Sequence, residues 1–161
     1  MTTDVRSNAP GDHDAIDLEA VYPHPVELVW RALTEPAALA TWLMTNDFQA
    51  KVGHRFTFRT DPAPGFDGIV RCRVLDCEPP RRLAYTWRGM PELPETMVSW
   101  SLEPVPGGTR LRLVHSGFAA DPALAPLRDL LGGGWRSKLL AITLPDLLGR
   151  LAAGSRPQGA P

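Results

Sequence analysis

Cysteine is scarce in this sequence of 161 residues, which contains only Cys72 and Cys77. If both residues lie on one strand, their odd separation places the side chains on opposite faces, so no bridge between them is expected. No HxH, HxxxH or CxxC pair is present either, and these are the spacings from which metal sites are built. The sequence therefore predicts reduced thiols, no disulfide framework and no metal or other cofactor.

An excess of either charge is also absent. Seventeen basic and 18 acidic side chains give a net charge of −1, and no polybasic run occurs. Neither nucleic acid nor an anionic membrane surface is expected as a partner, because both attract proteins through a field of positive charge.

Long apolar runs are missing too. No stretch of 18 apolar residues exists, so no membrane-spanning helix is expected, and residues 1–14 contain no apolar core of a secretory signal. The expected location is cytoplasmic. A phosphate-binding loop is not expected, because Gly132, Gly133 and Gly134 lack the Lys-Ser/Thr that would follow them. We interpret these glycines as a hinge before a helix, with residues 119–133 as a lid.

The chain divides into one domain and two tails. Residues 1–14 and 154–161 are polar or broken by Pro and Gly, which is typical of flexible tails. Residues 15–153 contain no linker and no repeat, and 43% of the sequence is hydrophobic. The sequence predicts a single domain over 15–153, of a length that buries a sizeable core.

Hydrophobic periodicity predicts the order of the elements. Residues 15–22 alternate as a half-buried strand does, and two short helices follow at 25–35 and 36–44, each opened by a proline. Strict alternation then returns in the five segments 53–60, 69–78, 81–89, 95–105 and 109–118. Tight turns join these segments, so they are expected to form an antiparallel meander.

The last element is expected to be one long helix over 132–154. Its apolar residues cover more than half of the circumference, so other structure must cover it. Pro145 lies within this segment, and a proline there removes a helical hydrogen bond and predicts a kink.

This order of elements, together with five short stretches of sequence, resembles the SRPBCC or START-like superfamily. Within this superfamily, the sequence is similar to the C-terminal domain of the activator of heat-shock protein 90 ATPase. The stretches are Pro25 to Thr34 with Trp42 following, Gly53 to Phe58, Glu78 to Trp87, Gly108 to Phe118, and the pair Gly134-Trp135. The resemblance covers about residues 15–152.

The resemblance implies an α+β, helix-grip fold of the bacterial-type single-domain kind. A curved antiparallel sheet would wrap around the long C-terminal helix, with two short helices after the first strand. Relatives of this fold carry lipids, bind plant hormones or cyclise polyketides. The superfamily has no shared catalytic residue set, and a fold alone does not fix a function. The chaperone-contacting N-terminal domain of the eukaryotic activator has no counterpart in these residues.

Candidate ligand-binding residues are the inward-facing aromatic side chains and their neighbours. Packing of the core explains them equally well, because a cavity would share the same faces. His115 is the only histidine expected on an inner strand face, either as a satisfied core residue or as a group that orients a ligand. The candidates are Trp42, Phe56, Phe58, Tyr85, Trp87, Trp100, His115, Trp135 and Leu139.

Arginines recur on the opposite face of the predicted strands. We interpret them as a solvated face whose cations pair with neighbouring Asp and Glu side chains. The aromatic residues have the opposite parity, so a nucleic-acid platform of interleaved basic and aromatic residues is not expected. The arginines are Arg55, Arg59, Arg71, Arg73, Arg88, Arg110 and Arg112.

The sequence analysis favours a binding protein for a small hydrophobic or amphipathic molecule, held in a cavity between the sheet and the C-terminal helix. No catalytic residue is nominated, because acid–base catalysis needs two titratable groups at one cleft and only His115 is expected inside. The alternatives are an enzyme of the polyketide cyclase/dehydratase type in the same cavity, or a co-chaperone-like protein-interaction module. A homodimer formed through an edge strand is left open.

Overall fold

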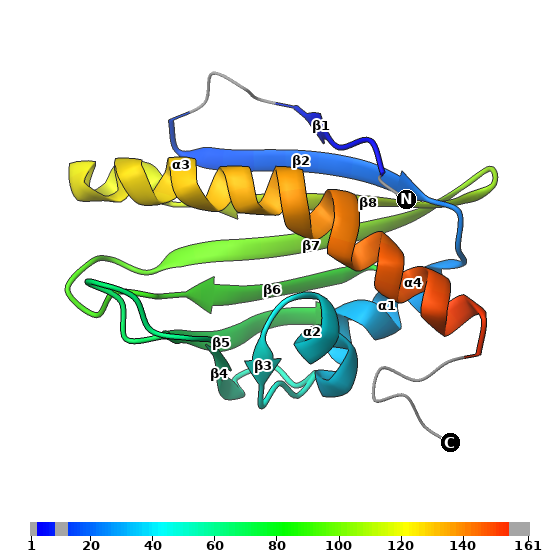
Figure 1. Cartoon of the computed structure of the whole chain (residues 1–161), viewed down its shortest axis with the longest axis horizontal. Coiled ribbons are helices and arrows are strands. Elements are labelled where there is room, and N and C mark those ends of the chain that lie inside the picture. The colour runs from blue at the N-terminus through cyan, green and yellow to red at the C-terminus, as the bar shows by residue number, and fades with distance from the viewer. Residues whose placement is uncertain (1–2, 9–12, 155–161) are drawn as a thin grey trace.

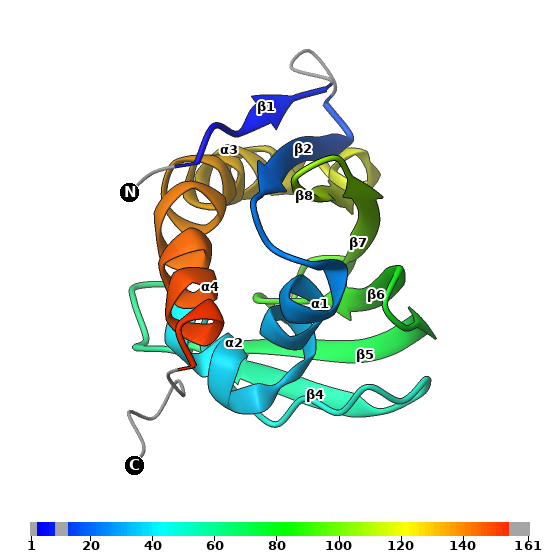
Figure 2. The same ribbon diagram turned by 90° about the vertical axis from the view of Figure 1, so that its right-hand side faces the viewer.

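The computed structural model describes residues 3–8 and 13–154, and its centre is one antiparallel sheet. Its eight strands lie in the order β1-β2-β8-β7-β6-β5-β4-β3. The sheet curves, and Figure 2 shows it as an arc from β2 to β4. The strands are β1 (Arg6–Ser7), β2 (Ala15–Tyr22), β3 (Thr45–Asn46), β4 (Arg55–Arg59), β5 (Ile69–Glu78), β6 (Arg82–Trp87), β7 (Thr96–Val105) and β8 (Gly108–Ser116).

Helices close the open side of this arc. Two short helices, α1 (Val26–Thr34) and α2 (Pro36–Trp42), follow β2 as the sequence predicts. A long helical segment crosses the concave side of the sheet at the end of the chain (Figure 1). It consists of α3 (Ala125–Gly134), the π-helix η3 (Trp135–Thr143) and α4 (Leu144–Ala152), after the 3₁₀ turns η1 (Phe118–Ala120) and η2 (Pro122–Leu124). The predicted helix-grip fold is confirmed.

Period-two patterning is what places one face of each strand in the core. In β7, Val98, Trp100 and Leu102 are buried while Met97 and Glu103 on the opposite face are exposed. The strand register places buried residues of neighbouring strands opposite one another, as with Trp100 of β7 and Leu83 of β6. The alternation read from the sequence therefore specifies which side chains face the helix.

Two residues of the predicted N-terminal tail belong to the sheet. Arg6 and Ser7 form β1, which pairs with Glu19 and Leu18 of β2. The guanidinium of Arg6 also lies 2.8 Å from the carboxylate of Glu19. A two-residue strand has no period of its own, so the sequence gives no signal for it. Of the two predicted tails, residues 1–2, 9–12 and 155–161 lie outside the described residues.

The predicted hinge at Gly132 to Gly134 is wrong. These glycines are helical, at the end of α3, and the helix begins upstream of them at Ala125. Residues 119–133, which the sequence analysis interprets as a lid, include the end of η1, the turn η2 and most of α3. The Asp121 side chain caps the 3₁₀ turn η2 by accepting the N–H of Ala123 at 2.9 Å, and Pro122 follows it.

The predicted kink near Pro145 is confirmed, since the helix changes direction between α3 and α4 (Figure 1). A proline has no N–H to donate to the carbonyl four residues earlier, here that of Ala141. The N–H of Thr3 donates to that carbonyl instead, at 2.8 Å. One residue earlier, the Leu140 carbonyl accepts the hydroxyl of Tyr22 at 2.7 Å. The bend is thus held to the rest of the fold by hydrogen bonds from the N-terminal part of the chain.

Candidate functional site

Four tryptophan rings form a continuous wall between the sheet and the C-terminal helix. Trp135 enters from η3, and its ring centroid lies 5.5 Å from that of Trp100 on β7 and 5.7 Å from that of Trp87 on β6. Trp42, the last residue of α2, lies 6.0 Å from Trp100 in an edge-to-face arrangement. Such offset geometries are the favourable ones for aromatic pairs.

The wall continues across β4 to the other end of the sheet. The ring of Phe58 lies 5.6 Å from Trp87, and Phe56 lies 5.3 Å from both Phe58 and Tyr85. These four residues are buried. The structure therefore brings together the aromatic candidates of β4, β6 and β7, whose rings contact one another across β5.

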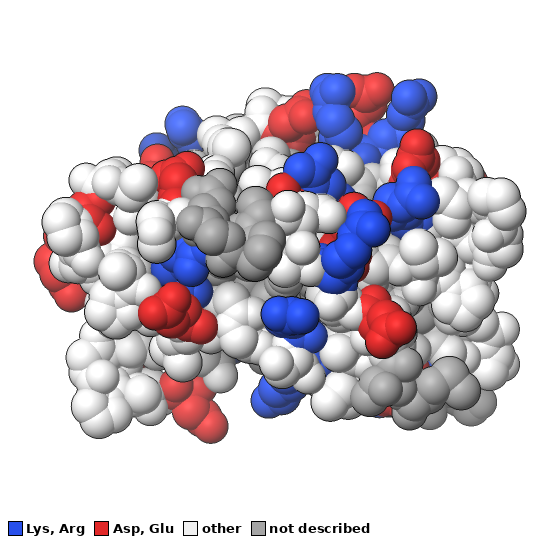
Figure 3. Space-filling view, turned by 90° about the horizontal axis from the view of Figure 1, so that it is seen from above, with Lys and Arg blue, Asp and Glu red and all other residues white. Residues whose placement is uncertain are grey.

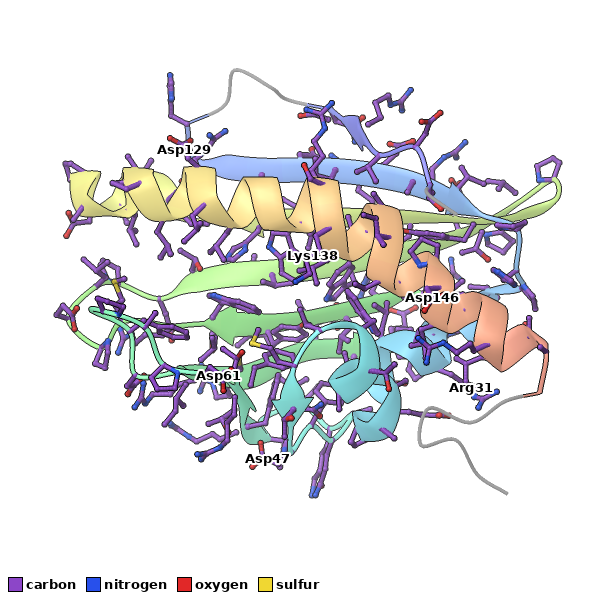
Figure 4. The ribbon with its side chains drawn as sticks, in the orientation of Figure 1. Arg31, Asp47, Asp61, Asp129, Lys138 and Asp146 are labelled. Atoms are coloured by element: carbon purple, nitrogen blue, oxygen red, sulfur yellow. The ribbon has the colours of Figure 1, made fainter. Side chains whose placement is uncertain are left out.

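Leu139 is the one candidate that is only partly buried. It lies on η3 and packs against the same core. Lys138, the residue before it, is exposed on the same helix (Figure 4). All nine candidates from the sequence analysis thus lie on the interior side of the sheet or the helix that covers it.

Polar atoms of the wall are satisfied within the protein. The indole N–H of Trp42 donates to the Ala32 carbonyl at 2.7 Å, and that of Trp100 donates to the Tyr85 hydroxyl at 3.0 Å. Burial raises the pKa of Tyr85 far above its usual range. The tyrosine therefore stays protonated at neutral pH, as a structural hydrogen-bonding group.

His115 is fully buried at the centre of a short hydrogen-bonded chain. The indole N–H of Trp135 donates to Nδ1 at 3.2 Å, so the ring proton of a neutral His115 must be on Nε2. Nε2 then donates to the Thr96 hydroxyl at 2.7 Å, and that hydroxyl donates to the Trp87 carbonyl at 3.2 Å. Both ring nitrogens are used inside the protein, which is the satisfied core histidine that the sequence analysis weighed.

Burial also lowers the pKa of His115 to about 3. An imidazole with such a pKa remains neutral near pH 7 and does not act as a general base that gains a proton there. Two other buried titratable groups are Tyr22 and Cys72, and desolvation raises the pKa of each. The interior described here is suited to apolar contact rather than to proton transfer.

Two hollows flank the C-terminal helix. One, of about 350 Å³, lies between β2 and the α3–η3 segment and includes Ile16, Gly132 and Arg136. The other, of about 480 Å³, lies between the end of β2 and α4 and includes Pro23 and Pro145. None of the nine candidate residues lines either hollow.

Phe48 and Tyr22 are among the members of the aromatic interior that the sequence analysis missed. Phe48 is buried in the segment after α2 and packs edge-to-face on Phe56 at 5.0 Å. It stands alone in a polar loop, so periodicity gives no signal for it. Tyr22 is fully buried and anchors η3, and its inward parity on the first strand was a signal that could have found it.

Within residues 3–8 and 13–154, no three His, Cys, Asp or Glu side chains gather as a metal-binding group. None of the described helices combines the length and hydropathy that crossing a bilayer requires.

A curved sheet that grips one long helix over an aromatic interior defines the helix-grip class of α+β proteins. Within that class, residues 23–142 match the family model described as Activator of Hsp90 ATPase homolog 1-like protein. The chain belongs to this family. This match confirms the resemblance stated in the sequence analysis. A search of curated proteins found no match.

Solved structures agree with this assignment. Protein MLL2253 from Mesorhizobium loti is 36% identical, with a TM-score of 0.75 over 84% of this chain and 97% of that one. CalU16 from Micromonospora echinospora is 25% identical, with a TM-score of 0.64 over 92% of this chain and 83% of that one. DynU16, a protein in the dynemicin biosynthetic locus, shares the fold at 23% identity and a TM-score of 0.69, over 92% of this chain and 51% of that one.

Proposed function

We propose that this protein binds a small apolar or amphipathic molecule between the sheet and the C-terminal helix. The observation that carries the proposal is the continuous aromatic wall, which has members on α2, on strands β4, β6 and β7 and on η3. Ligand sites for small molecules are lined mainly by apolar and aromatic side chains with a few fixed polar groups. The nine residues from Trp42 to Leu139 named above are the proposed contacts.

A ligand in this position has to displace some of the contacts between rings. The element suited to move is the α3–η3 segment, because α3 contains no buried residue and η3 buries only Trp135 and Leu140. A π-helix is rare and is frequently found at functional sites. The hollow between β2 and this segment, beside Gly132, is the proposed entrance. Movement of η3 away from β7 would open the space between Trp135 and Trp100.

The first experiment is native mass spectrometry of the protein purified from its own host, followed by extraction of what dissociates. A reproducible small-molecule mass supports the proposal and gives the ligand class. Titration of the extracted compound, followed by the fluorescence of the five tryptophans, then gives an affinity.

A pair of variants on the helix tests the location of binding. Leu139→Ser places a hydroxyl at the proposed contact and is expected to weaken binding about tenfold, since an unpaired buried hydroxyl costs roughly 1–3 kcal/mol. Ile142→Ser makes the same kind of change at a side chain that is 46% exposed on the same helix, so binding should be retained. Equal loss in both variants, or none in either, would rule out this site.

The two alternatives have less support. An enzyme of the polyketide cyclase/dehydratase type would need a titratable group poised near neutral pH, and His115 has a pKa of about 3. Its remaining support is the same fold in a protein of the dynemicin biosynthetic locus. A protein-interaction module would need a contiguous apolar patch. The exposed large apolar residues, however, include Val21, Val52 and Leu130 on three separate segments.

Location and assembly are part of the same proposal. A buried reduced Cys72 and a partly buried Cys77 suit a cytoplasmic protein. The edges of the described sheet are β1 and β3, each of two residues, so pairing of edge strands would contribute little to a homodimer.

A further inference from the structure

A third hollow lies on the outer face of the sheet, away from the aromatic wall. It has a volume of about 340 Å³ and spans β4, β5, β6 and the residues that join β6 to β7. Four guanidinium groups and one carboxylate surround it. The lining residues are Arg55, Arg71, Cys72, Arg73, Thr86, Arg88 and Glu95.

The strand register sets these arginines directly against one another. Arg55 of β4 is the partner of Arg73 of β5, and an isolated bridge pairs Arg71 with Arg88. Side chains directly opposite on an antiparallel pair approach closely, and two like charges in that position destabilise the sheet. The fold contains two such pairs side by side, an arrangement that an anion between them would stabilise.

Carboxylates of the protein neutralise only part of this charge. Asp67 lies 2.9 Å from the Arg71 guanidinium. Over residues 3–8 and 13–154, Arg55, Arg73 and Arg88 have no carboxylate within ion-pair distance. The Nε of Arg88 is buried and has no hydrogen-bond acceptor among these residues.

The two arginines of this set on β8 are paired as the sequence analysis expects. Arg112 contacts Asp17 at 2.6 Å, and Arg110 contacts Glu103 at 2.6 Å. Figure 3 shows acidic and basic side chains interspersed over the face that carries β1 and β2. The prediction that arginines of this face pair with neighbouring carboxylates is therefore confirmed at β2, β8 and β7. Around the hollow the prediction is wrong.

A hydroxyl at the floor of the hollow completes the site. Thr86 points to the outer face yet is only 7% exposed, because the arginine stems cover it. Its oxygen accepts the backbone N–H of Arg73 at 2.9 Å. The hydroxyl proton has no acceptor among the described residues, so it is available as a donor toward the hollow.

We propose that this hollow binds the phosphoryl group of a small phosphorylated molecule. Arginine matches phosphate oxygens with two parallel N–H donors, and several converging guanidinium groups are the usual form of such sites. Glu95 borders the hollow and would repel the anion, so the site favours a ligand whose charge faces Arg73 and Arg88. The site lies on the opposite face of the sheet from the aromatic wall and does not depend on it.

The test is titration with inorganic phosphate, pyrophosphate and glycerol 3-phosphate in a low-salt buffer free of other oxyanions. Amide shifts in β4–β6 and the melting temperature are followed. We expect one saturable site with a dissociation constant of about 1 mM or lower and a rise in melting temperature with ligand. Tighter binding of glycerol 3-phosphate than of inorganic phosphate indicates an organic phosphate, and the reverse order indicates free phosphate.

Matched variants decide whether the hollow is responsible. Arg73→Gln and Arg88→Gln should each weaken phosphate binding about tenfold, because each removes a charge-assisted pair of donors. Without ligand, Arg73→Gln should melt no lower than the wild type, since it relieves the repulsion with Arg55. Arg59→Gln removes the same charge from β4 outside the hollow and should change binding less than about twofold. Absence of saturable binding, or equal loss in Arg59→Gln, would overturn the proposal.

Discussion

The indole N–H of Trp135 donates to Nδ1 of His115 over 3.2 Å, and this buried bond joins the C-terminal helix to strand β8. Because Nδ1 accepts, the histidine is held in a single neutral tautomer, with its other nitrogen on Thr96. The contact makes the packing of the helix on the sheet sensitive to the protonation of one side chain.

The first prediction concerns stability below neutral pH. The pKa of His115 falls from 6.5 to about 3 on folding, so the unfolded chain binds a proton that the folded protein does not. The free energy of unfolding should therefore be constant above pH 6.5 and fall by about 1.4 kcal/mol for each unit below it, toward pH 3. Urea unfolding at pH 7, 6 and 5 measures this slope.

His115→Gln supplies the comparison, because an amide replaces the donor and acceptor but does not titrate. This variant should lose most of the slope between pH 6.5 and 5. Burial lowers the pKa of His24 as well, so His24→Gln is the matched control. This variant should retain the larger part of the slope of stability against pH. Asp17 contributes only at lower pH, since the hydrogen bond from Arg112 lowers the pKa of its carboxyl. An unchanged slope in His115→Gln would contradict the assignment.

The second prediction tests whether the glycine run is helical. A Cβ at Gly133 would meet no atom within 4 Å. Gly133→Ala should therefore raise the free energy of unfolding by about 0.5–1 kcal/mol, the difference in helix propensity between the two residues. Chemical denaturation measures it. A decrease would indicate that the segment needs non-helical conformations, as a hinge does.

The third prediction concerns the kink. Pro145→Ala restores an N–H that competes with Thr3 for the Ala141 carbonyl. We expect a gain in stability below about 1 kcal/mol, because Thr3 already satisfies that carbonyl and little of the usual cost of a proline remains to be recovered. Hydrogen exchange at the Thr3 amide should become faster at the same time. Unchanged exchange at Thr3 would show that the two segments are not coupled, and loss of ligand binding would show that the kink shapes the site.

The fourth prediction concerns the turn between β7 and β8. A Cβ at Gly108 would lie 2.0 Å from the carbonyl oxygen of Tyr22, which belongs to the backbone. Gly108→Ala should therefore destabilise the protein by about 3 kcal/mol. At Gly107 the φ of 84° is strained for alanine but no atom lies within 4 Å, so Gly107→Ala should cost only about 1 kcal/mol. Equal melting temperatures for the two variants would contradict the close approach at Gly108.

The strands other than the two-residue β1 and β3, together with the first two helices, could be predicted because their residues follow one period over several positions. The first strand, Ala15–Tyr22, alternates over its full length, and α1 follows a proline that suits its start. The family resemblance added the topology, which periodicity alone does not supply. The predicted helix began at residue 132, so residues 125–131 of α3 were missed. The three glycines after them oppose helix formation locally, and the helix continues through them because residues on both sides are helical.

The candidate site could be predicted only as a set of inward-facing residues. Parity indicates that Trp87, Trp100 and His115 share a face, but a partner such as Trp135 for His115 depends on where the helix lies in three dimensions. The outer hollow shows the same limit. The seven arginines were visible in the sequence, whereas the register that sets Arg55 against Arg73 is a property of the sheet.

The pairing of β2 with β8 has a consequence for synthesis of the chain on the ribosome. Residues 15–22 leave the ribosome early, yet their partners at 109–116 are made almost a hundred residues later. Until then β2 has no neighbour on that side, and the apolar faces of α1 and α2 have no helix above them. The C-terminal helix can cover the sheet only after Trp135 and the segment that follows it have been made. Translation pauses within residues 125–152 should therefore change the folding yield more than pauses earlier in the domain.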